Sequence, residues 1–106
     1  MSWIYLAAAG ILEIVWAVAM KQSAGFSRLI PTAVMLVAIL GSFGLLALSM
    51  KTLPLGTAYT IWTGIGAVGA FLVGITFLGE SVNILRIVAA TLIVLGIVVM
   101  KISTPA

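Results

Sequence analysis

Residues 3–20 read WIYLAAAGILEIVWAVAM, an apolar run that is interrupted by a single charged residue, Glu13. A run of this length crosses the hydrocarbon core of a bilayer, and Glu13 falls near its middle. Placing an ionisable group at that depth costs about 2.5–3.5 kcal/mol on insertion scales. A membrane helix that keeps such a residue usually uses it to bind protons, ions or a cationic ligand. We therefore expect Glu13 to be functional; the alternative is a protonated carboxyl that hydrogen-bonds a neighbouring helix.

The whole chain is as apolar as this first segment. Of its 106 residues 64% are hydrophobic and only 7% are charged, and the mean hydropathy is +1.41. No soluble domain covers that much apolar surface with so few charges, so the composition indicates an integral membrane protein with no appended soluble domain.

The residue types that are missing or scattered exclude several classes of function. The chain has neither Cys nor His, which argues against disulfides, thiol chemistry and the usual transition-metal sites, and no cofactor motif is present. The net charge of +3 comes from isolated basic residues, which is not the pattern of a nucleic-acid-binding surface. The start, Met1-Ser2-Trp3, lacks the basic region of a signal peptide.

Isolated charges divide the chain into four apolar segments, at about residues 3–21, 28–50, 56–78 and 83–101. The segments are continuously apolar rather than alternating, so they predict membrane-spanning helices and not the strands of a barrel. Ser27 and Asn83 are candidate caps for the second and fourth helices, and Gly25 suits a left-handed turn. We expect one all-α domain over residues 1–106, with four transmembrane helices whose short connections make neighbours antiparallel.

The basic residues are almost evenly divided between the two ends of these helices. Lys51 and Lys101 fall at one end, and Lys21, Arg28 and Arg86 fall at the other. Most membrane proteins show a clear excess of Lys and Arg on the cytoplasmic side. Two explanations remain open: other features fix one orientation, or the chain inserts both ways and forms an antiparallel dimer. A four-helix bundle of this size is too small to enclose a sizeable polar cavity alone, which also argues for an oligomer.

Several polar and aromatic side chains are expected to surround Glu13. Helical spacing places Gly10, Glu13 and Trp16 on one face of the first helix. The other segments add hydroxyl and aromatic groups at Ser42, Tyr59, Trp62 and Thr63. A carboxylate with hydroxyls and aromatic faces at low dielectric is a suitable site for a cation. Each residue alone has a simpler explanation: tryptophans lie in interfacial belts, serines join packed helices, and threonines bond back to their own helix.

Glycines are concentrated in the third segment. Gly64, Gly66 and Gly69 predict either a flexible hinge or close packing of small residues, and Gly96 belongs to a small-residue seam in the fourth segment. Glu80, the only other acidic residue, follows Gly79 in a predicted loop, where a solvated charge is expected.

The chain also resembles a known family of membrane proteins. Trp16-Ala17 after Glu13, the polar run 21–31 (KQSAGFSRLIP) and the block 51–67 (KTLPLGTAYTIWTGIGA) are similar to the motifs of the small multidrug resistance transporters. This resemblance covers essentially the whole chain. Within the family it is closer to the guanidinium exporter subtype than to the drug exporters, at Trp16, Ser42, Lys51, Thr57, Thr63 and Ala67. Thr60 departs from the pattern, since Ala is usual there.

The resemblance implies an antiparallel, dual-topology homodimer in the bacterial inner membrane. It also implies that both copies of Glu13 meet in one cavity with Trp16, Ser42, Tyr59 and Trp62, and that the activity is proton-coupled export of guanidinium and related small guanidinyl cations. Protons and substrate then compete for Glu13. The alternatives are an exporter of lipophilic quaternary ammonium drugs and a non-transporting partner subunit of a heterodimeric transporter. An enzyme is not expected, because the sequence offers no nucleophile–base pair.

Overall fold

The computed structural model describes residues 1–104, which contain four helices in chain order. They are α1 (Ser2–Gln22), α2 (Leu29–Ser49), α3 (Leu55–Phe77) and α4 (Ile84–Ser103). Each helix is long and apolar enough to cross a membrane, which confirms the expected class of fold. Residues 105–106, which the sequence prediction places in the same domain, lie outside the described residues.

Local chemistry sets the helix ends, and one of the expected caps is wrong. Asn83 caps α4 as expected, because its Oδ1 accepts a hydrogen bond from the Arg86 backbone N–H at 2.9 Å. Ser27 does not cap α2: Arg28 occupies the N-cap position, and the Ser27 hydroxyl instead donates to the carbonyls of Ser23 and Ala24. The hydroxyl is drawn back into the preceding turn because that turn is tight and supplies nearer acceptors.

The α1–α2 connection takes its shape from three consecutive residues in the left-handed region. Gly25 has φ +74° as expected, and its neighbours Ala24 and Phe26 have φ of 50° and 68°. Positive φ is unusual for residues with a side chain, so the turn is held by other contacts. Ser23 provides them: its hydroxyl accepts from the Phe26 N–H, and its carbonyl accepts from two backbone N–H groups, those of Ser27 and Arg28.

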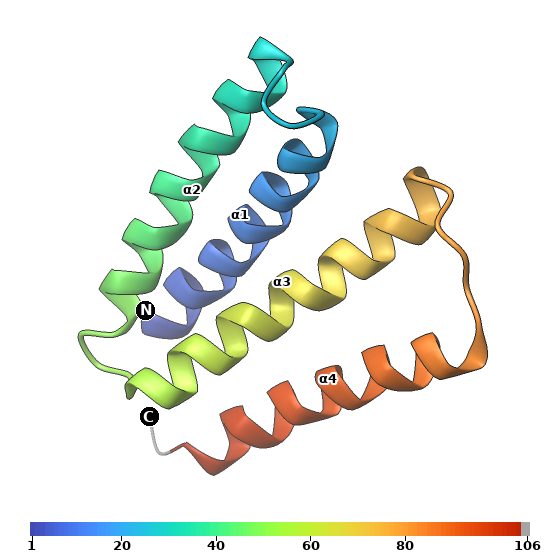
Figure 1. Cartoon of the computed structure of the whole chain (residues 1–106). Helices are drawn as coiled ribbons and strands as arrows, with labels where there is room; N and C mark the ends of the chain where they lie inside the picture. Colours follow the sequence, from blue (N-terminus) through green and yellow to red (C-terminus); the bar gives the residue numbers. More distant parts are fainter. Residues whose placement is uncertain (105–106) are drawn as a thin grey trace.

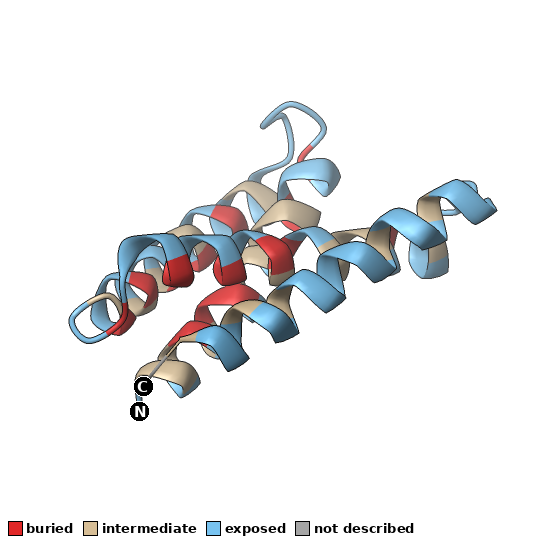
Figure 2. Cartoon of the chain, turned by 90° about the horizontal axis from the view of Figure 1, so that it is seen from below, coloured by how far each residue is buried: buried red, intermediate tan, exposed pale blue. Residues whose placement is uncertain are grey.

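Helix α1 is the centre of the arrangement. It packs along α2 and across α3, whereas α2 and α3 barely touch, and α4 packs along α3 on the side away from α1 and α2 (Figure 1). The molecule is flat, with principal extents of 43 × 34 × 16 Å. Figure 2 shows the consequence: buried residues lie on α1, α2, α3 and the connections between them, while α4 contains none.

The apolar core lies toward one end of the bundle, which we call the packed end. The core consists of Leu6, Ala9, Leu46, Leu53, Ala58, Ile61 and Trp62. Further contacts join the chain segments there: Thr57 and Thr104 share a hydrogen bond of 3.2 Å, and the Lys101 ammonium lies 5.0 Å from the centre of the Trp3 ring. At the opposite end, which we call the spread end, the α1–α2 and α3–α4 connections lie far apart (Figure 1).

Glu80 lies exposed in the connection between α3 and α4, as expected, and it also forms an ion pair. Its carboxylate lies 3.7 Å from the Arg86 guanidinium, and both side chains are partly exposed. A Cβ at Gly74 would lie 2.6 Å from Glu80 Oε1, and the Glu80 N–H donates to the Gly74 carbonyl. The absence of a side chain at position 74 lets the loop fold back onto α3, and this brings Glu80 within reach of Arg86.

Candidate functional site

Glu13 lies in the middle of α1 with its side chain half-buried against α3. Its neighbour there is Gly66: a Cβ at position 66 would lie 2.8 Å from Glu13 Cγ and closer still to the carboxyl group. Only glycine leaves room for the carboxyl at this point. Of the two roles predicted for Gly66, close packing is the one that these contacts support.

The packing of α1 on α3 repeats this pattern on either side of Glu13. Ile65 fills the space at Gly10, where a Cβ would meet its Cγ2 at 2.6 Å, and Ile14 lies against Gly69. Gly10 shares the Glu13 face of α1, as expected, but a branched side chain from α3 occupies the space beside it. Large side chains set against glycines therefore bring the two helices close together around Glu13.

Ser42 connects three helices through a single hydroxyl. It donates to the Ala9 carbonyl of α1 at 2.6 Å and accepts from the Trp62 indole N–H of α3 at 2.9 Å. Ser42 is fully buried and Trp62 is 7% exposed. Its role in the structure is thus to join helices. The structure describes no hydrogen bond between Ser42 and Glu13, although Ala9 lies one helical turn before Glu13 on α1.

Trp62 is also the centre of an aromatic cluster. The rings of Tyr59 and Phe43 each lie with their centres 5.6 Å from that of Trp62, Phe43 in an edge-on orientation. Tyr59 and Phe43 are about half exposed, so the cluster presents aromatic surface next to the buried indole. Phe43 is a member of this cluster that the sequence does not identify. Its position directly after Ser42 was the only available signal, and it does not reveal which way a ring turns.

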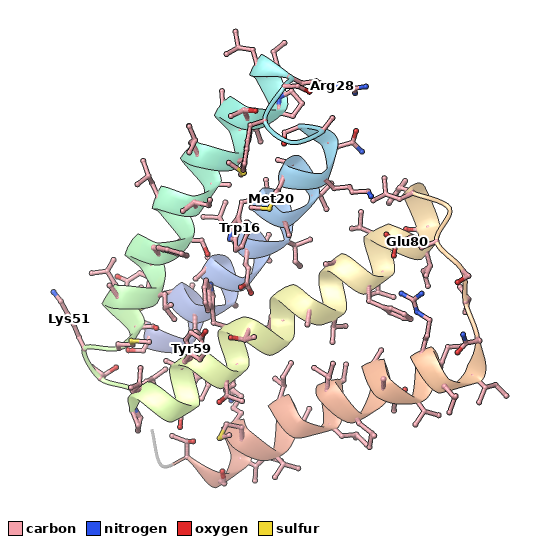
Figure 3. The ribbon with its side chains drawn as sticks, in the orientation of Figure 1. Trp16, Met20, Arg28, Lys51, Tyr59 and Glu80 are labelled. Carbon is pink, nitrogen blue, oxygen red and sulfur yellow. The ribbon has the colours of Figure 1, made fainter. Side chains whose placement is uncertain are left out.

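Trp16 and Thr63 lie in different surroundings. The Trp16 side chain projects from the half of α1 nearer the spread end (Figure 3), and its indole N–H is buried without a partner among the described residues. Thr63 is exposed and donates to the Tyr59 carbonyl of its own helix at 2.7 Å. Thr63, Tyr59 and Thr60 line a groove of about 460 Å³ between α3 and α4, and Glu13 is not among its lining residues.

The remaining glycines of interest lie along the same groove. A Cβ at Gly64 would meet Ile97 at 2.9 Å, so this glycine lets α4 approach α3 closely, whereas Gly96 on α4 faces open space. Both residues line the groove. The contacts of Gly64 again support a packing role, and Gly96 is available for a contact beyond this chain.

Two polar groups near the membrane centre lack hydrogen-bond partners among the described residues. Glu13 Oε1, an acceptor, and Trp16 Nε1, a donor, are both buried and make no hydrogen bond within residues 1–104. Such groups are rare in folded proteins, and each is a candidate position for binding or catalytic function. The described residues contain no group of three metal-ligating side chains. The unpartnered carboxyl oxygen suits a proton or a cationic hydrogen-bond donor.

Comparison with known proteins assigns the chain to a family. A family model described as "Small Multidrug Resistance protein" matches residues 1–93. The chain belongs to this family. Its curated relatives include proteins named "Guanidinium exporter" from Escherichia coli K12, 57% identical over 98% of this chain and 99% of the relative, and from Salmonella typhimurium LT2, 55% identical over 97% and 98%. A further protein of that name, from Yersinia pseudotuberculosis, is 52% identical over 98% of this chain and its own full length.

Membership of this family also defines the general type of protein. Small multidrug resistance proteins are transporters, so the chain is a transporter and not an enzyme, as expected from its sequence. Its four apolar membrane-crossing helices and its bacterial relatives make it a multi-pass protein of the bacterial inner membrane.

Proposed function

We propose that this protein exports guanidinium and related small guanidinyl cations in exchange for protons, with Glu13 as the shared binding group. The observation that carries the proposal is the unpartnered Glu13 oxygen, buried at the middle of a membrane-crossing helix. The near full-length similarity to proteins named guanidinium exporters supports the choice of substrate.

A guanidinium ion suits a buried carboxylate because of its shape and its donors. It is planar and presents its N–H groups in pairs, so two parallel hydrogen bonds to one carboxylate are possible, as in arginine–carboxylate pairs. Aromatic faces add attraction for a flat cation. In this proposal Trp16, Tyr59 and Trp62 wall the slot in which the ion binds.

Protons and the cation compete for the same carboxyl group. A protonated Glu13 has no charge with which to hold guanidinium, and the positive charge of a bound guanidinium favours the ionised carboxylate and so opposes its protonation. Proton entry from one side then drives cation release to that side, and the protonated site returns. Lowering the pH should weaken guanidinium binding, because protons displace it.

We further propose that the working unit is an antiparallel, dual-topology homodimer. The absence of buried residues on α4 and the nearly equal distribution of basic residues at the two ends both support it. In such a dimer two copies of Glu13 share one cavity, and exchange of the two subunits between equivalent conformations opens that cavity to each side in turn. The partner's groups then supply donors and acceptors for Glu13 and Trp16.

Ser42 has a positioning role in this scheme. Its hydroxyl fixes Trp62 relative to α1 and thereby sets the distance between the aromatic cluster and the helix that carries Glu13. Thr63, which faces the groove between α3 and α4, contributes through that groove rather than by direct contact with Glu13.

The decisive experiment records transport currents from purified protein in proteoliposomes. Guanidinium is added first and a bulky aromatic quaternary ammonium ion second, and the variant Glu13→Gln is measured alongside the wild type. We expect a current with guanidinium, little with the bulky cation, and none with Glu13→Gln, whose membrane insertion and dimer mass should be unchanged.

Each other result contradicts the proposal in a defined way. A stronger current with the bulky cation would make this protein a drug exporter. No transport of either ion, by current or by the proton flux that electroneutral exchange produces, would favour a partner subunit of a heterodimeric transporter. Retained proton-coupled guanidinium transport in Glu13→Gln would remove Glu13 from the mechanism.

A further inference from the structure

A second groove, separate from the candidate site, opens between α1, α2 and α3 at the spread end. Its volume is about 550 Å³, and every residue that lines it is apolar except Gln22. The groove exists because α2 and α3 both pack on α1 while barely touching each other. We call it the α2–α3 groove.

The length of the α2–α3 groove corresponds to one leaflet of a bilayer. Along α1 its lining runs from Ile14, next to Glu13, to Gln22 at the helix end. Eight residues of α-helix rise roughly 12 Å. Half of a hydrocarbon core of about 30 Å is about 15 Å. The groove thus extends from the level of the membrane centre to the level of the headgroups.

Two exposed basic residues lie close in the chain to residues that line the outer end of this groove. Lys21 lies three residues after Val18, a lining residue, and therefore on the same face of α1. Arg28 is the N-cap residue of α2, at the level where Ile30 and Pro31 line the outer end of the groove. Figure 3 shows Arg28 at the α1–α2 connection, projecting outward.

Neither cation is neutralised within the part of the chain that the structure describes. The one ion pair there joins Arg86 to Glu80 and takes up the only carboxylate outside the membrane centre. The outer end of the groove therefore combines two exposed positive charges with the Gln22 amide, directly above an apolar channel.

We propose that the α2–α3 groove binds an anionic phospholipid, with one acyl chain between α2 and α3 and the phosphate between Lys21 and Arg28. Basic residues at a membrane surface each attract anionic lipid by about 1 kcal/mol. A second copy of this chain fits less well, because it brings a net charge of +3 and its own Glu80 is paired with Arg86. The acyl chain reaches Ile14, which packs on Gly69, and so supports the α1–α3 contact beside Glu13.

Native mass spectrometry of the purified protein tests this proposal. The protein is titrated with phosphatidylglycerol or with phosphatidylcholine of the same acyl chains. We expect preferential retention of phosphatidylglycerol, and about a thirtyfold loss of its affinity in the double variant Lys21→Ala/Arg28→Ala, which corresponds to about 2 kcal/mol. The matched control is Lys51→Ala, an exposed lysine in the connection at the packed end, which should change the affinity less than twofold.

A second variant tests the apolar part of the site. Val34 lines the groove and is 45% exposed, so Val34→Trp fills the channel without displacing the core. It should lower the affinity for both lipids at least tenfold while the helical content is unchanged. Three outcomes would each overturn the proposal. They are equal retention of the two lipids by the wild type, a loss of affinity in Lys51→Ala equal to that in Lys21→Ala/Arg28→Ala, and full affinity in Val34→Trp. Conversion of the groove variants to monomers would assign the groove to a subunit interface and would likewise overturn it.

Discussion

Gly66 is the residue whose size limits the candidate site most directly. The Glu13 carboxyl group occupies the volume that any side chain at position 66 would need. Glycine has a cost in a helix of about 1 kcal/mol relative to Ala, so its presence at a buried helical position needs a compensating reason. The reason is that glycine leaves room for the Glu13 carboxyl group. The position of this group, which belongs to α1, therefore depends on the residue at position 66 of α3.

We predict that Gly66→Ala lowers guanidinium transport at least tenfold. The added methyl group forces the Glu13 side chain into another rotamer or pushes α1 away from α3. Initial rates of transport in proteoliposomes measure the effect. Gly44→Ala is the matched control, because Gly44 is also a glycine within a membrane-crossing helix but a Cβ there meets nothing within 4 Å. Equal rates for the two variants would show that contact between Glu13 and Gly66 does not matter for transport.

At the scale of helices, the hydroxyl of Ser42 supplies directional contacts between helices, which the apolar side chains around it cannot supply. It fixes the relative positions of α1, α2 and α3 by two directional hydrogen bonds, where apolar packing alone permits sliding. Hydrogen bonds between helices in a membrane are worth about 0.6–2 kcal/mol each, so the pair is a moderate contribution with a strong effect on geometry.

We predict that Ser42→Ala destabilises the protein by about 1–3 kcal/mol, because it removes both interhelical hydrogen bonds and leaves the Trp62 indole N–H buried without a partner. Ser49→Ala is the control: Ser49 is equally buried on α2, but its hydroxyl bonds only the Leu46 carbonyl of its own helix. Ser49→Ala should lower the free energy of unfolding by less than about 0.5 kcal/mol. Unfolding in mixed micelles compares the two variants, and equal losses would contradict a role for Ser42 between helices.

The helices of the structure could be predicted closely from the sequence, and the arrangement of the candidate site could be predicted less well. Apolar runs bounded by charges place the helix ends within one or two residues, since the bilayer dictates helix length and backbone bonding. The direction of a side chain depends on neighbours that are distant in sequence. Ile65 fills the space at Gly10, an outcome that depends on how α3 lies against α1, whereas the bond of Thr63 to its own helix is local and was one of the two interpretations of the sequence. The periodicity of residues within one helix does not encode the angle at which that helix packs against another.

At the scale of the whole molecule, the flat shape and the exposed α4 leave much apolar surface outside the core. Large apolar residues such as Leu85, Leu92 and Val99 on α4 are more than half exposed. In a membrane such a surface contacts lipid or another helix, and small residues such as Gly96 permit close helix contact. The two ends of the molecule differ little in charge, because Glu80 offsets Arg86 at the spread end.

We predict that the chain inserts in both orientations, in about equal amounts. The chain has no Cys, so Ser81→Cys, in the exposed α3–α4 connection, introduces a single thiol whose side of the membrane can be read directly. An impermeant maleimide applied to intact cells should label about half of the protein, and permeabilisation should expose the remainder. Ser81→Cys combined with Lys51→Ala removes a positive charge from the packed end and should shift the ratio, because Lys and Arg near helix ends set orientation. Labelling that is all or none in the first variant would rule out dual topology and, with it, the antiparallel arrangement of two identical chains.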